Sequence, residues 1–217
     1  MSQARVTALE CPVCRGPLRG LRHDVLFGCS ACDLAVYIDD GDRRAFRVRF
    51  AAAEVDEPGP RIHLPIWEVL VRVDVPAPDR DRARLASLAR EIERVWVVGF
   101  RARHPSLFDD PGLELSERRF EARDDPHPPS GAPLVGACRG PAVIARSAEL
   151  YVLDFLDRRA DVTDLAVDVG ISRAQLWAVP FVDKEGRLRE LLTGTSLPDH
   201  VFEDLPEIRA ELARDSA

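Results

Sequence analysis

Four of the five cysteines stand in two closely spaced pairs near the start of the chain. Cys11 and Cys14 bracket Pro-Val, Cys29 and Cys32 bracket Ser-Ala, and fourteen residues separate the two pairs. Two residues between cysteines allow a tight turn that directs both sulfurs to one point, and two such turns supply the tetrahedron of thiolates that zinc prefers. The spacing predicts one structural zinc ion (Zn2+), with these four cysteines as its metal ligands.

Other interpretations of the cysteine pairs stay open. Chance dithiols or disulfides are one alternative, which a reducing compartment disfavours, and iron bound to four thiolates is another. Four protein ligands leave no coordination position for water or substrate, so the spacing favours a structural over a catalytic metal. Such a metal replaces the hydrophobic core that a module of about fifty residues can barely build. We therefore expect the metal to hold this module alone.

Short strands are expected to position the two cysteine pairs. Residues 25–28 lead into the second pair and residues 34–38 lead out of it. A turn at 39–42 precedes a further strand at 45–50, in which apolar residues and arginines alternate. The pattern predicts a small β module over 1–50.

With these pairs and strands, the first fifty residues resemble the four-cysteine zinc-ribbon family. The resemblance covers under a quarter of the chain. Glycine often follows the second cysteine of each pair in that family, whereas Arg15 and Asp33 stand there in this sequence and Gly16 comes one residue later. The resemblance implies a zinc-ribbon fold for residues 1–50 and permits an association with nucleic acid.

The chain as a whole is expected to be an α+β protein, an N-terminal zinc ribbon followed by a mixed α+β domain. Residues 51–60 lack periodicity and end in Pro-Gly-Pro, which is typical of a linker. Residues 61–217 form the larger domain, with a Pro/Gly-rich connection at 121–141. Its expected elements are a strand at 67–75, a helix at 79–94, a strand at 95–100, a helix at 147–159 capped by Ser147, strands at 164–169 and 175–182, a turn at 183–186, a strand at 187–192 and a C-terminal helix that begins at Pro206.

Two segments of the larger domain share a short pattern. Trp, Val and Phe occur at the same spacing in 96–100 and in 177–181, each on an expected strand that follows a helix. The match suggests a duplicated unit, and coincidence between two apolar strands is the alternative.

Charge is distributed unevenly along the chain. The net charge is −7, yet residues 1–50 carry eight basic and six acidic residues, whereas 151–217 carry eight basic and fourteen acidic residues. A protein that neutralises many phosphates normally has a basic face, which only the first module supplies. The nucleic-acid-binding residues of this alternative are Arg15, Arg19, Arg22, Arg43, Arg44, Arg47 and Arg49.

No catalytic residue emerges from the sequence. Phosphate-binding glycine loops and the Gly-x-Ser-x-Gly motif are absent, and the five histidines show no ligand spacing. Cys138 has no base that the sequence pairs with it, so we expect an inert thiol. No small-molecule substrate is identified, and an enzyme with an unrecognised site in the α+β domain is the last-ranked alternative.

The partner that these observations favour is another protein. A saturated metal site, the lack of a catalytic motif and an acidic C-terminal region indicate an adapter or accessory subunit in a protein assembly, with a nucleic-acid-associated ribbon in transcription or RNA processes as the alternative. The apolar stretches are too short to span a membrane. The N-terminus has no signal-peptide pattern, so a cytoplasmic location is expected.

Overall fold

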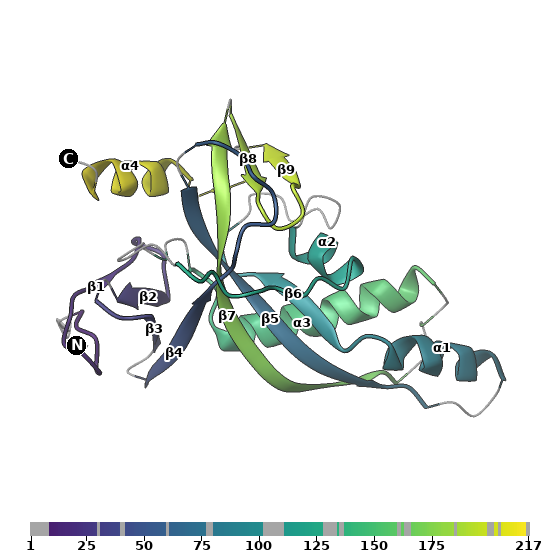
Figure 1. Ribbon diagram of the computed structural model, residues 1–217. Helices are drawn as coiled ribbons and strands as arrows, with labels where there is room; N and C mark the ends of the chain where they lie inside the picture. Colours follow the sequence, from purple (N-terminus) through teal and green to yellow (C-terminus); the bar gives the residue numbers. More distant parts are fainter. Residues whose placement is uncertain are drawn as a thin grey trace.

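Two long antiparallel strands, β5 (Arg61–Asp74) and β7 (Asp168–Lys184), form the centre of the computed structural model (Figure 1). Trp67, Val69 and Val73 are buried on one face of β5, as the alternation in the sequence predicts. The strand begins six residues earlier than expected, because its first half is buried on both faces. The structure describes residues 9–29, 31–39, 42–59, 61–76, 80–101, 111–127, 134, 137–159, 162, 166–184, 186–198, 202–203 and 205–215.

The other strands extend this central pair into one mixed sheet. Its order is β1-β2-β3-β4-β7-β5-β6, with β8 and β9 attached beside β7. All neighbouring strands are antiparallel except β4 and β7, which run parallel through Val48–Phe50 and 176–178. The added strands are β1 (Leu18–Arg19), β2 (Leu26–Cys29), β3 (Leu34–Asp39), β4 (Asp42–Phe50), β6 (Arg94–Val98), β8 (Arg187–Glu190) and β9 (Ser196–Pro198).

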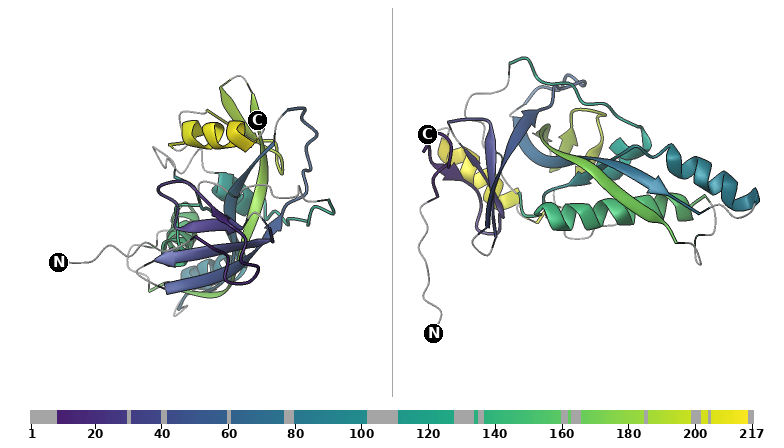
Figure 2. Two further views of the ribbon diagram at one scale, coloured as in Figure 1. Left: turned by 90° about the vertical axis from the view of Figure 1, so that its left-hand side faces the viewer. Right: turned by 90° about the horizontal axis from the view of Figure 1, so that it is seen from below.

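Apolar side chains form a core on each face of the β5–β7 pair. On one face, Trp67 and Leu176 pack with residues of α1 and α3. Both helices lie beside the long strands in Figure 2. On the other face, Trp177 and Phe181 pack with Trp96 and with residues of α2, β8 and α4. The helices are α1 (Arg80–Arg90), α2 (Pro111–Glu117), α3 (Pro141–Asp157) and α4 (Leu205–Asp215), and none of the described helices is long and apolar enough to cross a membrane.

The mixed helix and strand content agrees with the expected class, with corrections to single elements. Helix α3 begins at Pro141 after an N-cap at Gly140, so Ser147 lies inside the helix and does not cap it. The described part of the strand expected at 164–169 joins the strand expected at 175–182 from Asp168 onward, because β5 offers a continuous partner for β7. The helix start expected at Asp79 and part of the connection at 121–141 lie outside the described residues.

A duplicated unit is not shown by this topology. Trp96 lies on β6, a short edge strand, whereas Trp177 lies in the middle of the long central strand β7. The two indole rings do meet, with centroids 6.2 Å apart in the same core. They occupy different positions in one sheet.

The strands of residues 1–50 are continuous with the rest of the sheet. Leu26, Ala35 and Val48 belong to the same buried cluster as Trp67 and Leu176. The segment expected as a linker forms no helix or strand over its described residues 51–59. It is nevertheless hydrogen-bonded to other parts of the same chain: the N–H of Glu54, for example, donates to the C=O of Leu191 at 2.9 Å. The division into a ribbon, a linker and a second domain stays a prediction.

Candidate metal centre

The first cysteine pair sits on a tight turn that its own backbone closes. The N–H of Arg15 donates to the C=O of Cys11 at 3.0 Å, and the N–H of Cys11 donates to the C=O of Gly16 at 2.9 Å. The N–H of Gly16 also lies 3.4 Å from Cys14 Sγ, which accepts from it. The turn therefore presents both sulfurs on one side and offers a donor to a thiolate.

The second pair lies between β2 and β3 and is held by a different set of backbone hydrogen bonds. The N–H of Leu34 donates to the C=O of Cys32 at 2.8 Å, and the N–H of Ala31 donates to Cys29 Sγ at 3.4 Å. Each turn thus carries one backbone N–H directed at a sulfur, which stabilises the thiolate form that binds a metal.

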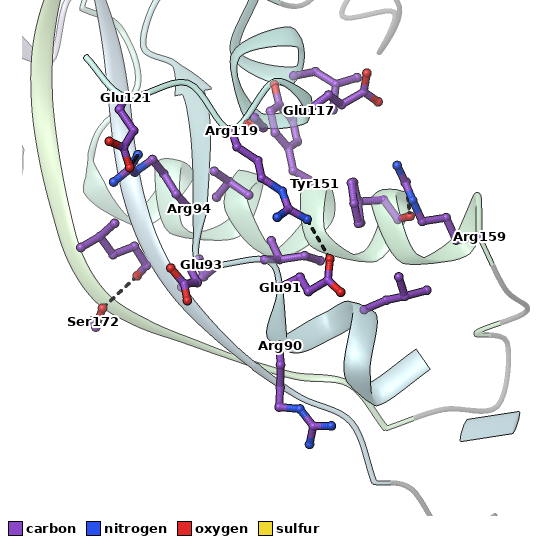
Figure 3. A pocket seen from close by; sticks show the side chains of 18 residues that line it. Arg90, Glu91, Glu93, Arg94, Glu117, Arg119, Glu121, Tyr151, Arg159 and Ser172 are labelled. Carbon is purple, nitrogen blue, oxygen red and sulfur yellow. Dashed lines mark hydrogen bonds and ion pairs between the residues drawn. The ribbon is translucent and has the colours of Figure 1, made fainter. Parts of the chain in front are cut away.

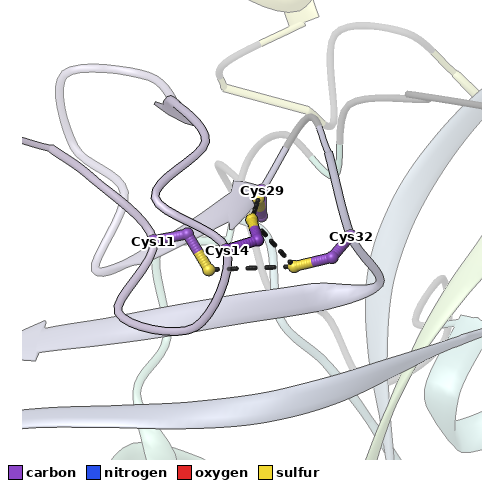
Figure 4. Close-up of side chains that lie close together, drawn as sticks. All are labelled: Cys11, Cys14, Cys29 and Cys32. Atoms are coloured by element: carbon purple, nitrogen blue, oxygen red, sulfur yellow. Dashed lines mark hydrogen bonds between the residues drawn. The ribbon is translucent and has the colours of Figure 1, made fainter.

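The four sulfurs converge on one point between the two turns (Figure 4). Sγ of Cys14 lies 3.4 Å from that of Cys29 and 3.5 Å from that of Cys32, and Cys11 and Cys32 are 3.7 Å apart. All four atoms lie within 4.8 Å of one another. Four sulfurs bound to zinc at about 2.3 Å lie roughly 3.8 Å apart in a regular tetrahedron. The four cysteines therefore fit a single tetrahedral metal ion, although their geometry does not identify the metal.

Burial and pKa differ between the four thiols. Cys11 is fully buried, Cys14 is exposed, and Cys29 and Cys32 are half-buried. The backbone N–H of Cys14 lowers the pKa of Cys11 to about 7, whereas burial raises the pKa of Cys32 well above its ordinary value. One thiolate is thus available near neutral pH to begin binding a cation, whose charge would favour ionisation of the others.

Two residues after the first pair show how this sequence forms the turn without glycine directly after Cys14. Arg15 adopts φ of 63°, the left-handed conformation that glycine adopts without cost. Gly16 is needed for a different reason, because a Cβ there would lie 2.8 Å from the Cβ of Ala31 and 3.3 Å from Cys14 Sγ. The second turn packs directly against Gly16, and this contact sets the distance between the two turns.

The arginines proposed for nucleic acid do not share one surface. Arg43 and Arg47 are exposed on one face of β4, and Arg44 lies on the opposite face. Arg49 is paired with Asp124 through two hydrogen bonds of 2.7 and 2.6 Å, and its guanidinium lies 4.2 Å from the ring of Trp177. Arg15, directly after Cys14, is exposed, as is Arg22, and Arg19 is half-buried on β1.

A cleft that the sequence does not reveal lies between α1, β6, α2 and α3 (Figure 3). Its volume is about 800 Å³. Arg119 pairs with Glu91 across it at 2.8 Å, and Arg94 pairs with Glu121 at 3.4 Å. The apolar lining consists of Leu70, Val71, Leu88, Ile92, Val95, Leu113, Tyr151 and Phe155. The cleft can hold an apolar group, and these charged side chains on its lining neutralise one another.

The fifth cysteine lies away from the metal centre. Cys138 is half-buried, and its thiol donates to the C=O of Gly99 at 3.5 Å. All five cysteines are free thiols in the structure, which contains no disulfide between them.

Comparison of the chain with protein-family models, with curated proteins and with solved structures finds no match.

Proposed function

We propose that this chain is a non-enzymatic zinc-binding protein that acts as an adapter or accessory subunit in a protein assembly. The observation that carries the proposal is the convergence of four thiols on one point. With four protein ligands the metal has no position left for water or substrate, so its role is to fix the conformation of the two turns. Zinc is proposed because it combines a preference for thiolates with tetrahedral geometry.

The tip of the first turn supplies a surface for a partner. Val13, between the two cysteines, is 68% exposed, and Leu9, just before the turn, is 44% exposed. Large apolar side chains held in water by a rigid turn gain free energy when a partner covers them. The metal fixes the turn before binding, which reduces the entropy lost on association. We therefore propose that the cysteine turns contact the assembly through Val13.

A pull-down from native lysate tests this function with two matched variants. Val13→Asp places a charge at the tip of the first turn, and Val143→Asp places the same charge at a valine on α3 that is 51% exposed. If the chain is an adapter, we expect protein partners that still co-purify after nuclease treatment. They should be lost with Val13→Asp and should remain with Val143→Asp. Zinc content is measured in the same samples, and it should be equal in all three proteins.

Two outcomes of the pull-down would contradict the adapter function. Partners that disappear after nuclease treatment would indicate a nucleic-acid-associated ribbon and would bring the exposed arginines of β4 into the site. Recovery of the protein alone, with its zinc bound, would direct attention to the cleft between α2 and α3 and to an enzymatic role.

A further inference from the structure

Part of the central strand β7 has a hydrogen-bonding partner on one side only. Residues 168–175 pair with β5 apart from Ser172, which stands in a β-bulge between the pairs Leu70–Arg173 and Val71–Ile171. Strand β4 pairs with β7 only at 176–178, and β8 pairs with it only from Phe181 onward. In Figure 1, β4 and this half of β7 diverge from their short contact. We call the outer side of β7 over 168–175 the open edge.

The open edge begins where a side chain ends the β4–β7 ladder. The amide Nε2 of Gln175 donates to the C=O of Arg47 at 2.9 Å and to its neighbour Leu176 at 3.0 Å. Beyond this point, no backbone hydrogen bond from another described segment reaches the outer side of 168–174. An antiparallel strand bonds through every second residue on each side, so about half of these residues direct N–H and C=O groups outward.

Exposure along β7 agrees with an uncovered edge. Asp168 and residues 170–174 are exposed, including Ile171, a large apolar residue that is 37% exposed. The opposite edge of the sheet is protected, since Ser116 Oγ accepts the N–H of Trp96 on β6 at 2.7 Å. Natural sheets protect long edges with proline, lysine, a β-bulge or a covering segment. The open edge contains no proline or lysine, and its one irregularity is the bulge at Ser172, which leaves residues 168–171 and 173–175 paired with β5.

The two faces beside the open edge differ in chemistry. Val169 and Ile171 pair with Val73 and Val71, so they extend the face that holds the apolar core. Arg173 lies on the other face, opposite Leu70. A strand that pairs with this edge would place alternate side chains against an apolar and a basic surface.

Two arginines give the polar face its charge. Arg173 on β7 and Arg47 on β4 lie on the same face of the sheet. Arg49 is the partner of Trp177, and every second side chain of a strand points to the same face, so Arg47 and Arg173 both share the face of that pair. Both are exposed, and within the described part of the chain neither makes an ion pair. Neighbouring Arg49 is already neutralised by Asp124. Their positive charge favours acidic residues in a strand that pairs with the edge.

We propose that the open edge binds an extended segment of a partner protein in which apolar and acidic residues alternate. The segment adds a strand to the sheet, with main-chain hydrogen bonds for affinity and with Ile171 and Arg173 for selectivity. This inference rests on the proposed adapter function and names the chemistry of one of its partners. It concerns a surface separate from the cysteine turns.

Labelled synthetic peptides test the inference by fluorescence anisotropy with the full chain. The probe is a short peptide that alternates glutamate with valine. Its controls alternate lysine with valine or carry N-methyl groups on alternate amides. We expect binding of the glutamate peptide alone. Arg173→Glu should weaken it about tenfold or more, because an attraction becomes a repulsion between facing side chains.

Variants and outcomes separate this inference from its alternatives. Arg90→Glu, which reverses an exposed charge elsewhere, should bind the peptide as the native chain does. Equal binding of the N-methylated or lysine peptide, or absence of binding, would overturn the inference. So would a homodimer that Arg173→Glu dissociates in light scattering, or a single-stranded oligonucleotide that displaces the peptide. If the peptide does not bind but partners sensitive to Val13→Asp remain in the pull-down, the adapter function stands without the open edge.

Discussion

Removal of a metal from the four cysteines is expected to destabilise the whole sheet, beyond residues 1–50. Residues 1–50 taken alone predict a module that the metal stabilises independently. In the structure, however, Leu26 and Val48 are buried in the same cluster as Trp67 and Leu176. Parallel pairing of β4 with β7 adds main-chain hydrogen bonds between the same two parts. Opening of the cysteine turns therefore exposes core residues of the neighbouring region.

The size of this effect follows from the burial of two ribbon side chains. Leu26 is fully buried and Val48 is 5% exposed. Burial of each such side chain contributes about 1.5 to 3 kcal/mol, so the rest of the chain would lose about 3 to 6 kcal/mol. In a protein of this size, 1 kcal/mol corresponds to about 2 to 4 °C in melting temperature. We expect chelation to lower the melting temperature by roughly 6 to 24 °C.

Tryptophan fluorescence provides a suitable assay, because all three tryptophans lie outside the cysteine turns. Trp67 also contacts the ribbon directly, with its ring 5.4 Å from that of Phe46. Thermal melts monitored by fluorescence would be compared before and after chelation, and with Cys32→Ser. The control is Cys138→Ser, which removes the one thiol outside the cluster and should leave metal content unchanged.

Chelation that removes the metal but leaves the fluorescence melt unchanged would contradict this prediction. In that case the ribbon would be an independent module, as the sequence alone suggests, and the β4–β7 contact would contribute no measurable stability.

Three further predictions concern single residues. Gly16→Ala should weaken metal binding about tenfold or more in competition with a chelator, because its Cβ meets the second turn; Arg15→Gly should not weaken it, because glycine accepts the left-handed φ. Burial lowers the pKa of His63 to about 4, so below about pH 6.5 the unfolded chain binds a proton that the folded chain does not. The free energy of unfolding, measured in urea, should therefore fall by about 3 kcal/mol as pH drops from about 6.5 towards 4. His63→Phe should remove this pH dependence. Glu190→Ala should cost about 2 to 4 kcal/mol in urea unfolding, because the buried carboxylate accepts the N–H groups of Leu192 and Thr193. An unchanged metal affinity of Gly16→Ala would contradict the first prediction, and a stability independent of pH would contradict the second. An unchanged free energy of unfolding of Glu190→Ala would contradict the third.

Local patterns in the sequence were sufficient for the metal centre and for the strand that begins the second region. The two Cys-x-x-Cys turns depend on residues that are neighbours in the chain, and the alternation around Val69 and Val71 reflects the burial of one strand face. Such features require no knowledge of distant partners.

Features that depend on distant residues were not predictable in the same way. The parallel pairing of β4 with β7 joins segments more than one hundred residues apart, and neither strand contains a signal for it. Ser147 resembles a helix cap locally, but Pro141 begins α3 two turns earlier, where proline is favoured in the first turn. The cleft and the open edge likewise result from the packing of several elements, so no single sequence motif predicts them.

X-ray absorption spectroscopy on the native protein, with the metal quantified per chain, tests the central claim most directly. We expect one zinc ion per chain, bound by four sulfur atoms at about 2.3 Å and with no oxygen or nitrogen ligand. Iron in the site would contradict the choice of metal. A light-atom ligand in the coordination shell, or a chain without metal and with two disulfides, would contradict the saturated structural site on which the adapter function depends.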